Sequence, residues 1–369
     1  MGVNLDTRCI ESPVATEIYI SVAPGEDASP HQQAAEIFSG ITDVLHSKKA
    51  YILQERVFAV QSAMDIVPNV RSEAYGDIDN GVAPAFLLCN KGMSGPIAGV
   101  QIHAVIADSK PEVIDLDGAL CGRILHLPGR TYLTLSQISA PDFEQPTEQA
   151  RAMLEKAESA LRQFGADFLS VPRTWMWLGD ILSWYGDFNR VRNEFFTERG
   201  AIGRPNRQSM PASTGIGLIP AGGGKCAMDL VAVLEPSDSI HNLPAVGKQH
   251  CALEYGSAFS RASRAITPAG ETVFVSGTAS IDATGATTNI GDAAGQINAT
   301  VENVRAVLKD MHCADKDVVQ MVAYCKTAKV EKIFNDFSSN LPWPGLTVIC
   351  DICRPDLLFE IEAAAMPRT

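Results

Sequence analysis

The feature that constrains the fold most is an order of elements that occurs twice along the chain. In the last third, a strand-like segment over 272–277 leads into a helix whose apolar residues recur at helical spacing. An apolar run over 318–325 has the length of a buried strand, a short helix follows over 330–337, and strands over 346–352 and 358–364 close the unit. This order predicts a mixed α+β unit.

The middle third repeats the same order. Its expected elements are a strand, a helix, a strand, a second helix and two closing strands, over 132–138, 153–164, 167–175, 187–198, 214–219 and 226–234. Short matches support the repeat: Met228-Asp229-Leu230 aligns with Phe359-Glu360-Ile361, and Asn193-Glu194-Phe195 aligns with Asn335-Asp336-Phe337. Each match is short, so their common order is the evidence for an internal repeat.

The first third is a more degenerate version of this unit. Strands are expected over 18–22, 52–59 and 97–106, with a helix over 35–45. We therefore predict three units in one chain, over residues 1–125, 126–245 and 246–369. The polar segment 237–248 is typical of a linker before the last unit.

The composition excludes several classes of function. The formal net charge of −13 gives the surface no general attraction for nucleic acid or anionic membranes. Neither an apolar stretch of about 18 residues nor a basic segment before an apolar run is present, so no membrane span and no signal peptide are predicted. Cys350 and Cys353 form one C-x-x-C, but no second ligand pair follows, so we expect no metal and a cytoplasmic protein with reduced thiols.

Several motifs carry a resemblance to known families. The last unit resembles the RidA/YjgF family of reactive-intermediate deaminases, with the chorismate mutase-like fold, at 274–277, Asn303, 317–319, 344–347 and 359–363. The whole chain resembles the chorismatases, in which RidA-like units are fused; the matching segments are 53–58, 173–175, 184–185, 213–215 and 255–261. The resemblance implies a monomer with pseudo-threefold symmetry, no cofactor, and an active site between the central and last units.

One departure from the RidA pattern bears on activity. RidA deaminases carry an arginine that binds the substrate carboxylate in a Pro-x-Arg-Ser/Thr motif. The corresponding residues are Leu346 in the last unit and Ser213 in the central unit. Because the guanidinium fork is missing, imine deamination is not expected.

Glu360 is the expected proton donor. Chorismate carries an enol ether, and its cleavage begins when a positioned, protonated acid transfers a proton to the methylene carbon. Glu360 and Glu362 share one face of a strand, so burial and like charge would both raise the pKa of one of them. The resemblance selects Glu360, which matches the functional glutamate of the family. The alternative is an acidic strand edge that faces solvent.

Cys353 and Ala262 bear on the product. The resemblance implies that a cysteine at position 353 marks the branch that makes 3-hydroxybenzoate, whereas an inert residue there marks simple hydrolysis. Seven residues separate Cys353 from Glu360, and a hairpin would bring them together. The resemblance implies a second position whose residue differs between the two branches. Ala262 occupies that position, and alanine there does not clearly indicate the cysteine branch. The alternative for Cys353 is a small buried apolar residue.

Chorismate has two carboxylates, so cations and hydrogen-bond donors are expected in the site. Arg173 and Arg204 are the first choices, and the further candidates are Arg261, Lys326, Tyr132, Ser213, Thr214 and Gly215. The segment Ser213–Gly215 would act as a nest of backbone N–H groups. The alternatives are surface charges for the cations, a plain turn for the nest and core packing for Tyr132.

The leading hypothesis is an enzyme that converts chorismate to pyruvate and 3-hydroxybenzoate. Three alternatives stay open at this point. The first is hydrolysis to 3,4-dihydroxycyclohexa-1,5-diene carboxylate, the second is RidA-like imine deamination, and the third is a non-catalytic sensor of aromatic metabolites.

Overall fold

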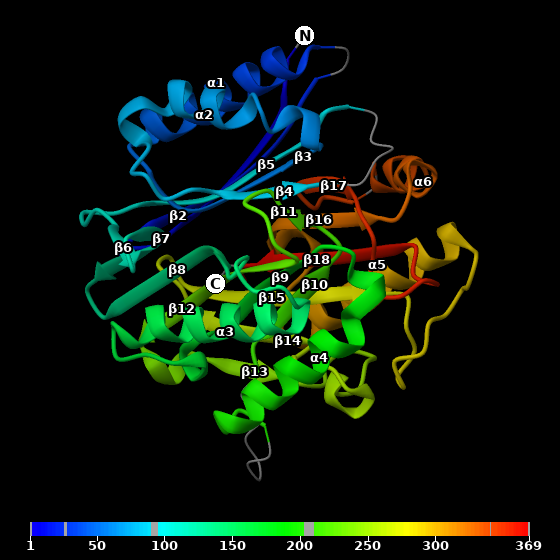
Figure 1. The fold of residues 1–369 in the computed structure, drawn as a ribbon. Coiled ribbons are helices and arrows are strands. Elements are labelled where there is room, and N and C mark those ends of the chain that lie inside the picture. Colours follow the sequence, from blue (N-terminus) through cyan, green and yellow to red (C-terminus); the bar gives the residue numbers. More distant parts are fainter. Residues whose placement is uncertain (1, 26–27, 90–94, 203–209, 340, 368–369) are drawn as a thin grey trace.

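A computed structural model describes residues 2–25, 28–89, 95–202, 210–339 and 341–367. These residues form three six-stranded sheets, each with helices on one side (Figure 1). The first unit contains β1 (Asn4–Glu11), β2 (Thr16–Ala23), α1 (Pro30–Lys48), β3 (Tyr51–Ala59), α2 (Val67–Tyr75), β4 (Ala85–Leu88) and β5 (Ile97–Ile106). Helix α1 begins where the sequence favours it, because Ser29 caps the N–H of Gln32 and Pro30 takes the first turn.

The central unit follows the same path. It contains β6 (Glu112–Leu116), β7 (Ala119–Leu127), β8 (Arg130–Ser139), α3 (Pro146–Arg162), β9 (Arg173–Leu178), α4 (Ile181–Glu198), β10 (Ala212–Ile216), β11 (Ile219–Pro220) and β12 (Cys226–Glu235). The short strand β11 leaves this unit and pairs with β4 of the first sheet. It therefore ties the first two units together.

The last unit repeats the path once more. It contains β13 (His241–Leu243), β14 (Ala262–Ile266), β15 (Glu271–Ala279), α5 (Ala293–Asp310), β16 (Val318–Cys325), α6 (Ala328–Ser338), β17 (Gly345–Ile349) and β18 (Phe359–Ala365). Side-chain caps start both helices: Asp292 accepts from the N–H of Gly295, and Thr327 accepts from the N–H of Val330.

The three sheets share one strand order, which confirms the repeated fold. The orders are β1-β2-β5-β3-β4, β7-β8-β12-β9-β10 and β14-β15-β18-β16-β17, and each sheet has one further edge strand. In each unit the two strands joined through the second helix are parallel, and the other pairs are antiparallel. The aligned tripeptides at 228–230 and 359–361 fall on the equivalent strands β12 and β18.

The sheets divide the chain earlier than the boundaries we predicted. The boundary at 125 passes through β7, which pairs with β8 in the central sheet, so the first sheet's own strands end at Ile106. The boundary at 245 follows β13, although β13 pairs with β14 in the last sheet. Hydrophobic patterning does not reveal which neighbour an edge strand pairs with, because that choice is made by contacts between strands.

Two predicted elements differ locally from the structure. The segment 167–175 begins as a single 3-10 turn over Phe168–Ser170 before β9, because the Asp167 side chain caps the N–H of Leu169. Helix α4 begins at Ile181 rather than at 187 and therefore includes Trp184 and Tyr185. This earlier start carries Tyr185 to the site described below.

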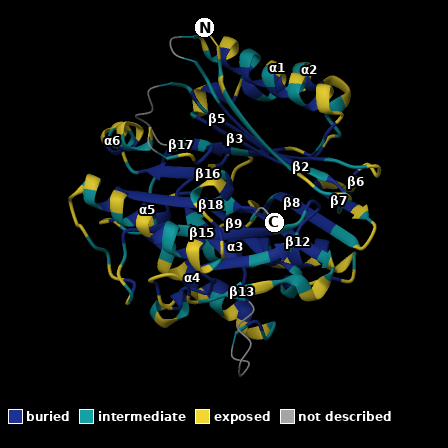
Figure 2. Ribbon diagram, turned by 180° about the vertical axis from the view of Figure 1, so that it is seen from behind, coloured by how far each residue is buried: buried dark blue, intermediate teal, exposed yellow. Residues whose placement is uncertain are grey.

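The core is arranged around the pseudo-threefold axis. Each unit has its own cluster between sheet and helices, and a further cluster joins the inner faces of all three sheets; Phe58, Trp177, Val322 and Val348 belong to it. Accordingly, the strands are largely buried and exposed residues lie on the outer helix faces (Figure 2). No helix among the described residues is long and apolar enough to cross a bilayer.

Candidate active site

A cleft opens where the central unit meets the last unit. It encloses about 520 Å³, counting the solvent at its mouth. Helix α4 and strand β10 supply one wall, and segments of the last unit around β14, β15 and β18 supply the other. The polar residues and the cysteine that line it are Tyr185, Arg192, Ser213, Tyr255, Ser257, Arg261, Cys353, Arg354 and Glu360.

Glu360 lies inside this cleft on the central strand of its sheet. Strand β18 runs between β15 and β16, and Glu360 is paired there with Ala279 and Tyr324. Its neighbours Phe359 and Ile361 point into the core of the last unit, so the carboxyl points towards the central unit. Only 4% of the residue is exposed, which contradicts the solvent-facing alternative.

The surroundings favour the protonated form of Glu360. Burial is the main cause that raises its pKa, the charge of Glu362 adds to it, and the charges of Arg173 and Arg354 oppose it; the resulting pKa is about 8. Among the described residues, none donates a hydrogen bond to this carboxyl in the ordinary range of geometry. A carboxylic acid in this position is still protonated at neutral pH and can act as a general acid.

The absence of a side chain at Gly277 leaves the space that the Glu360 carboxyl occupies. A Cβ atom added to Gly277 would lie 2.1 Å from Oε1 of Glu360. The N–H of Gly277 donates to Oγ1 of Thr214 at 3.1 Å. The carboxyl therefore lies directly against backbone that any larger residue would cover.

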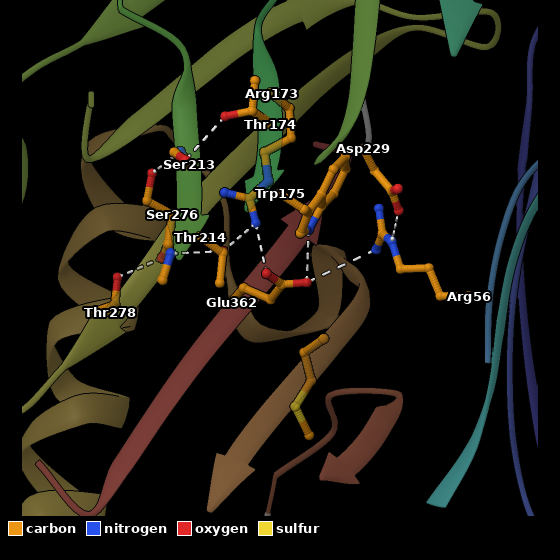
Figure 3. A network of polar contacts seen from close by, with 12 residues as sticks. Arg56, Arg173, Thr174, Trp175, Ser213, Thr214, Asp229, Ser276, Thr278 and Glu362 are labelled. Carbon is orange, nitrogen blue, oxygen red and sulfur yellow. Dashed lines mark hydrogen bonds and ion pairs between the residues drawn. The ribbon is translucent and has the colours of Figure 1, made fainter. Parts of the chain in front are cut away.

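Glu362, two residues further along the strand, is held by donors from two other units (Figure 3). Nη2 of Arg173 donates to its Oε2 at 2.8 Å, and Nε1 of Trp175 donates to its Oε1 at 2.9 Å. Nη1 of Arg56 lies 3.9 Å from the same Oε1. Glu362 thus faces a second cavity at the pseudo-threefold axis rather than the cleft.

Arg173 does not line the cleft, in contrast to our prediction for it. Its side chain is 2% exposed and is paired with Glu362, and its Nη2 also donates to Thr214 Oγ1 at 2.6 Å. Burial lowers the pKa of its guanidinium to about 10. Its charge is paired with Glu362, although its Nη1 has no hydrogen-bond partner.

The three arginines that line the cleft, Arg192, Arg261 and Arg354, have no carboxylate partner among the described residues. Arg192, on α4, donates from Nη2 to Asn189 at 2.6 Å, and its Nε has no hydrogen-bond partner. Arg261, just before β14, donates from Nε to the carbonyl of His250 at 2.9 Å, and its Nη2 has no partner. Both guanidinium groups are buried, and burial lowers the pKa of Arg192. Such groups favour an anionic ligand.

At the two other interfaces between units, side chains of the protein itself occupy the position that corresponds to the cleft. Between the first and central units, Arg71 of α2 binds Glu55 at 2.7 Å and Asp79 at 2.8 Å, and the hydroxyl of Tyr75 donates to Glu55 at 2.8 Å. Between the last and first units, Leu346 packs so closely on β5 that a Cβ at Gly99 would lie 2.7 Å from it. Arg123 of β7, at the interface of the first and central units, pairs with no carboxylate in the described part of the chain and instead donates to the carbonyls of Leu53 and Val82 and to Asn80.

The remaining predicted residues have different fates. Ser213 and Gly215 line the cleft, but both lie in strand β10 with Thr214, so their N–H groups alternate in direction and cannot form a nest. The N–H of Ser213 already donates to Ser276 at 2.8 Å. Thr214 binds Arg173 and Gly277, so its hydroxyl serves the structure around Glu360.

Four predicted residues are not placed in the cleft. Tyr132 is 3% exposed and lines the axial cavity, and Lys326 donates to the carbonyl of Pro355 at 2.6 Å on the surface. Ala262 follows Arg261 but packs in the core of the last unit. Arg204 lies outside the described residues.

Cys353 lines the cleft beside Glu360, although the predicted hairpin is absent. Strand β16 lies between β17 and β18, so the loop between those two strands, and not a turn, carries Cys353 to the site. Burial first, and then the charge of Glu360, raise the pKa of its thiol to about 12. Cys353 is therefore a neutral thiol at the wall of the cleft, and in the described part of the chain no group of three His, Cys, Asp or Glu residues gathers that could hold a metal ion.

Sequence reasoning missed Arg192, Arg354, Tyr185 and Tyr255. Tyr185 and Arg192 lie seven residues apart, which places them on the same face of α4 two turns apart. That spacing was the available signal, and the late helix start we predicted concealed it. Tyr255 and Arg354 come from loops, and their guanidinium-to-ring distance of 5.4 Å follows only from tertiary packing.

Comparisons with known proteins agree with this architecture. The family model described as Endoribonuclease L-PSP matches residues 255–367. A crystal structure of a chorismatase superposes with a TM-score of 0.64 and 17% identity, covering 99% of this chain and 100% of that chain, which shows a common fold. A 3-hydroxybenzoate synthase of Streptomyces hygroscopicus is 32% identical over 306 residues, covering 74% of this chain and 84% of that protein. At that identity and coverage, the chain belongs to the chorismatase family.

Proposed function

We propose that the protein cleaves chorismate into pyruvate and 3-hydroxybenzoate, with Glu360 as the acid and without a cofactor. The observation that carries the proposal is a buried carboxyl group, whose pKa burial raises to about 8, in a cleft whose arginines have no carboxylate partner among the described residues. The printed name of the relative from Streptomyces hygroscopicus supports the product, and the family supports the substrate.

The cleft suits each part of this substrate. Arg192 and Arg261 would bind the two carboxylates, and Arg354, which donates to the carbonyl of Gly285 and lies over Tyr255, would add to the positive field. Glu360 would transfer its proton to the methylene carbon of the enolpyruvyl group. In hydrolysis, water would add to the cation formed at the ether carbon, and the resulting hemiketal would collapse to pyruvate and the ring alcohol. In the 3-hydroxybenzoate branch, the oxygen of the ring hydroxyl would attack the ring carbon that carries the ether, pyruvate would leave with the ether oxygen as its keto oxygen, and loss of a proton would make the ring aromatic.

The two product branches differ by one molecule of water. Chorismate has the atoms of pyruvate plus 3-hydroxybenzoate, so that branch consumes no water overall. Hydrolysis adds one water molecule and gives pyruvate plus dihydroxycyclohexadiene carboxylate. The test of the proposal is incubation of the protein with chorismate, a coupled assay for pyruvate, and identification of the second product by mass. Tight binding of hydroxybenzoates without any pyruvate release would favour the sensor hypothesis instead.

Cys353→Ala is expected to shift the products from 3-hydroxybenzoate towards the dihydroxycyclohexadiene carboxylate, with total pyruvate release kept within a few fold. The thiol is a neutral group at the cleft wall beside Glu360, so its loss opens space for water without changing the charge of the acid. The measurement is the ratio of the two products by liquid chromatography and mass spectrometry. Cys350→Ala is the matched control, since Cys350 packs in the shared core and not in the cleft. An unchanged product ratio in Cys353→Ala would contradict a role for this thiol.

Gly277→Ala is expected to lower the rate of pyruvate release by about 10- to 100-fold, because the new methyl group must displace the Glu360 carboxyl. Gly186→Ala is the control: it lies on α4 next to Tyr185, and a Cβ there meets no atom within 4 Å. Initial rates for both variants and their crystal structures provide the check. Full activity in Gly277→Ala would show that the carboxyl position seen here is not needed for the reaction.

A further inference from the structure

We propose that Glu362 is a positioning residue, which keeps Glu360 in its acid form by fixing a second carboxylate charge on the same face of β18. The inference rests on the proposed function, since it explains how the acid of that reaction is kept ready. Glu362 does not line the cleft, so it acts through Glu360 and not on the substrate.

The geometry around Glu362 fixes its charge in one place. Arg173 and Trp175 donate one hydrogen bond to each carboxylate oxygen, at 2.8 and 2.9 Å (Figure 3). Arg56 approaches from the first unit at 3.9 Å, and the residue is 4% exposed. A charged donor on one oxygen and a neutral donor on the other hold this carboxylate in place.

The spacing along the strand places the carboxylate of Glu362 close to Glu360. Residues two apart in a strand lie about 6.6 Å apart on the same face, and little water separates buried groups at that distance. A negative charge there disfavours ionisation of Glu360. Glu362 also neutralises Arg173, whose charge would otherwise favour the ionised form of Glu360. Both effects of Glu362 therefore keep the proton on Glu360.

The other groups near Glu360 do not replace this effect. Arg354 favours ionisation of Glu360. The remaining ionisable neighbours are tyrosines and cysteines from α4, β16 and the loop before β18, namely Tyr185, Tyr324, Cys350 and Cys353. Their pKa values are raised, so these side chains stay neutral. Arg192, also in the cleft wall, is cationic. Among the described residues around Glu360, Glu362 is thus the carboxylate that raises its pKa.

The experiment compares pH profiles of pyruvate release for the wild type and Glu362→Gln. Wild-type activity should fall as pH rises through about 8, since Glu360 loses its proton there. In Glu362→Gln this alkaline limb should move down by at least about one pH unit. The rate near pH 5 should then stay within several fold of the wild type, while the rate at pH 8 should fall by at least about fivefold. A merely structural role for Glu362 would lower the rate equally at all pH values.

Two further variants serve as controls for a loss of folding in Glu362→Gln. Trp175→Phe removes one hydrogen bond from Glu362 but keeps the carboxyl group beside Glu360, so its limb should stay in place. Glu55→Gln removes a buried, arginine-paired carboxylate at the other interface and should also leave the limb in place. If the limb stayed in place in Glu362→Gln, or moved as far in Trp175→Phe as in Glu362→Gln, the proposal would be overturned.

Failure of the proposed function can be told apart from failure of this inference. Carbon-13 labelling of glutamate carboxyl groups allows Glu360 to be titrated directly by NMR, with Glu360→Gln identifying its signal. The midpoint should be lower in Glu362→Gln than in the wild type, whether or not chorismate is turned over. An unchanged midpoint would overturn the inference, while absence of pyruvate with a shifted midpoint would overturn only the choice of substrate.

Discussion

Replacing Glu360 with Gln is expected to lower the rate of pyruvate release from chorismate by about 10³-fold or more. A glutamine has the shape of the acid and fits against Gly277, but it has no proton to transfer to carbon. Because Glu360 is buried and without a hydrogen-bond partner among the described residues, an uncharged amide should not destabilise the fold. Single-turnover rates of pyruvate formation, with circular dichroism and thermal unfolding as checks on the fold, measure the effect.

Glu331→Gln provides the matched control for that experiment. Glu331 lies on α6, is not part of the cleft, and burial raises the pKa of its carboxyl as well. Its replacement should leave pyruvate release unchanged. Undiminished release by a folded Glu360→Gln protein would remove Glu360 from the mechanism, and equal losses in both variants would point to a general effect on the fold.

The second large effect is expected from Arg261→Gln, which should lower kcat/KM for chorismate by about 30- to 1000-fold. A buried charge-assisted contact to a carboxylate is worth about 2–4 kcal/mol, which corresponds to that range. Arg192→Gln should have a similar effect through the other carboxylate. The measurement is kcat/KM from initial rates, together with the affinity for 3-hydroxybenzoate, which retains only one of the two carboxylates.

Arg264→Gln and Arg261→Lys sharpen that test. Arg264 lies three residues later, on β14, but its side chain is 40% exposed and faces Glu271, so its loss should change kcat/KM by less than about twofold. Arg261→Lys keeps the charge and loses the planar fork, so it should recover only part of the activity. If Arg261→Gln behaved like Arg264→Gln, the substrate carboxylates would have to bind elsewhere.

The three interfaces between units differ in what occupies the position of the cleft. Glu55 supplies to Arg71 the carboxylate that a ligand would supply to Arg192. Leu346 fills the third interface with apolar atoms instead.

The sequence by itself determined the repeated α+β unit and the direction in which Glu360 points. Both depend on local regularities: apolar residues at periods of 2 and 3.6 set the elements, and the alternation along one strand puts Glu360 and Glu362 on the face opposite Ile361. Patterns of this kind extend over a few neighbouring residues, so they can be predicted from the sequence without knowledge of the tertiary structure. The expectation that Cys353 lies near Glu360 rested on a hairpin that does not exist, and the loop between β17 and β18 brings Cys353 to the cleft beside Glu360 instead.

Only the tertiary structure decided which cations face the cleft. Arg173 and Arg192 look alike in the sequence, yet Arg173 meets Glu362, 189 residues away, while Arg192 meets no carboxylate among the described residues. The strength of a charge interaction depends on distance and burial, and both are set by the packing of segments that are remote in the chain. For the same reason, the division of roles between two glutamates on one strand became visible only when their partners from the other units were in place.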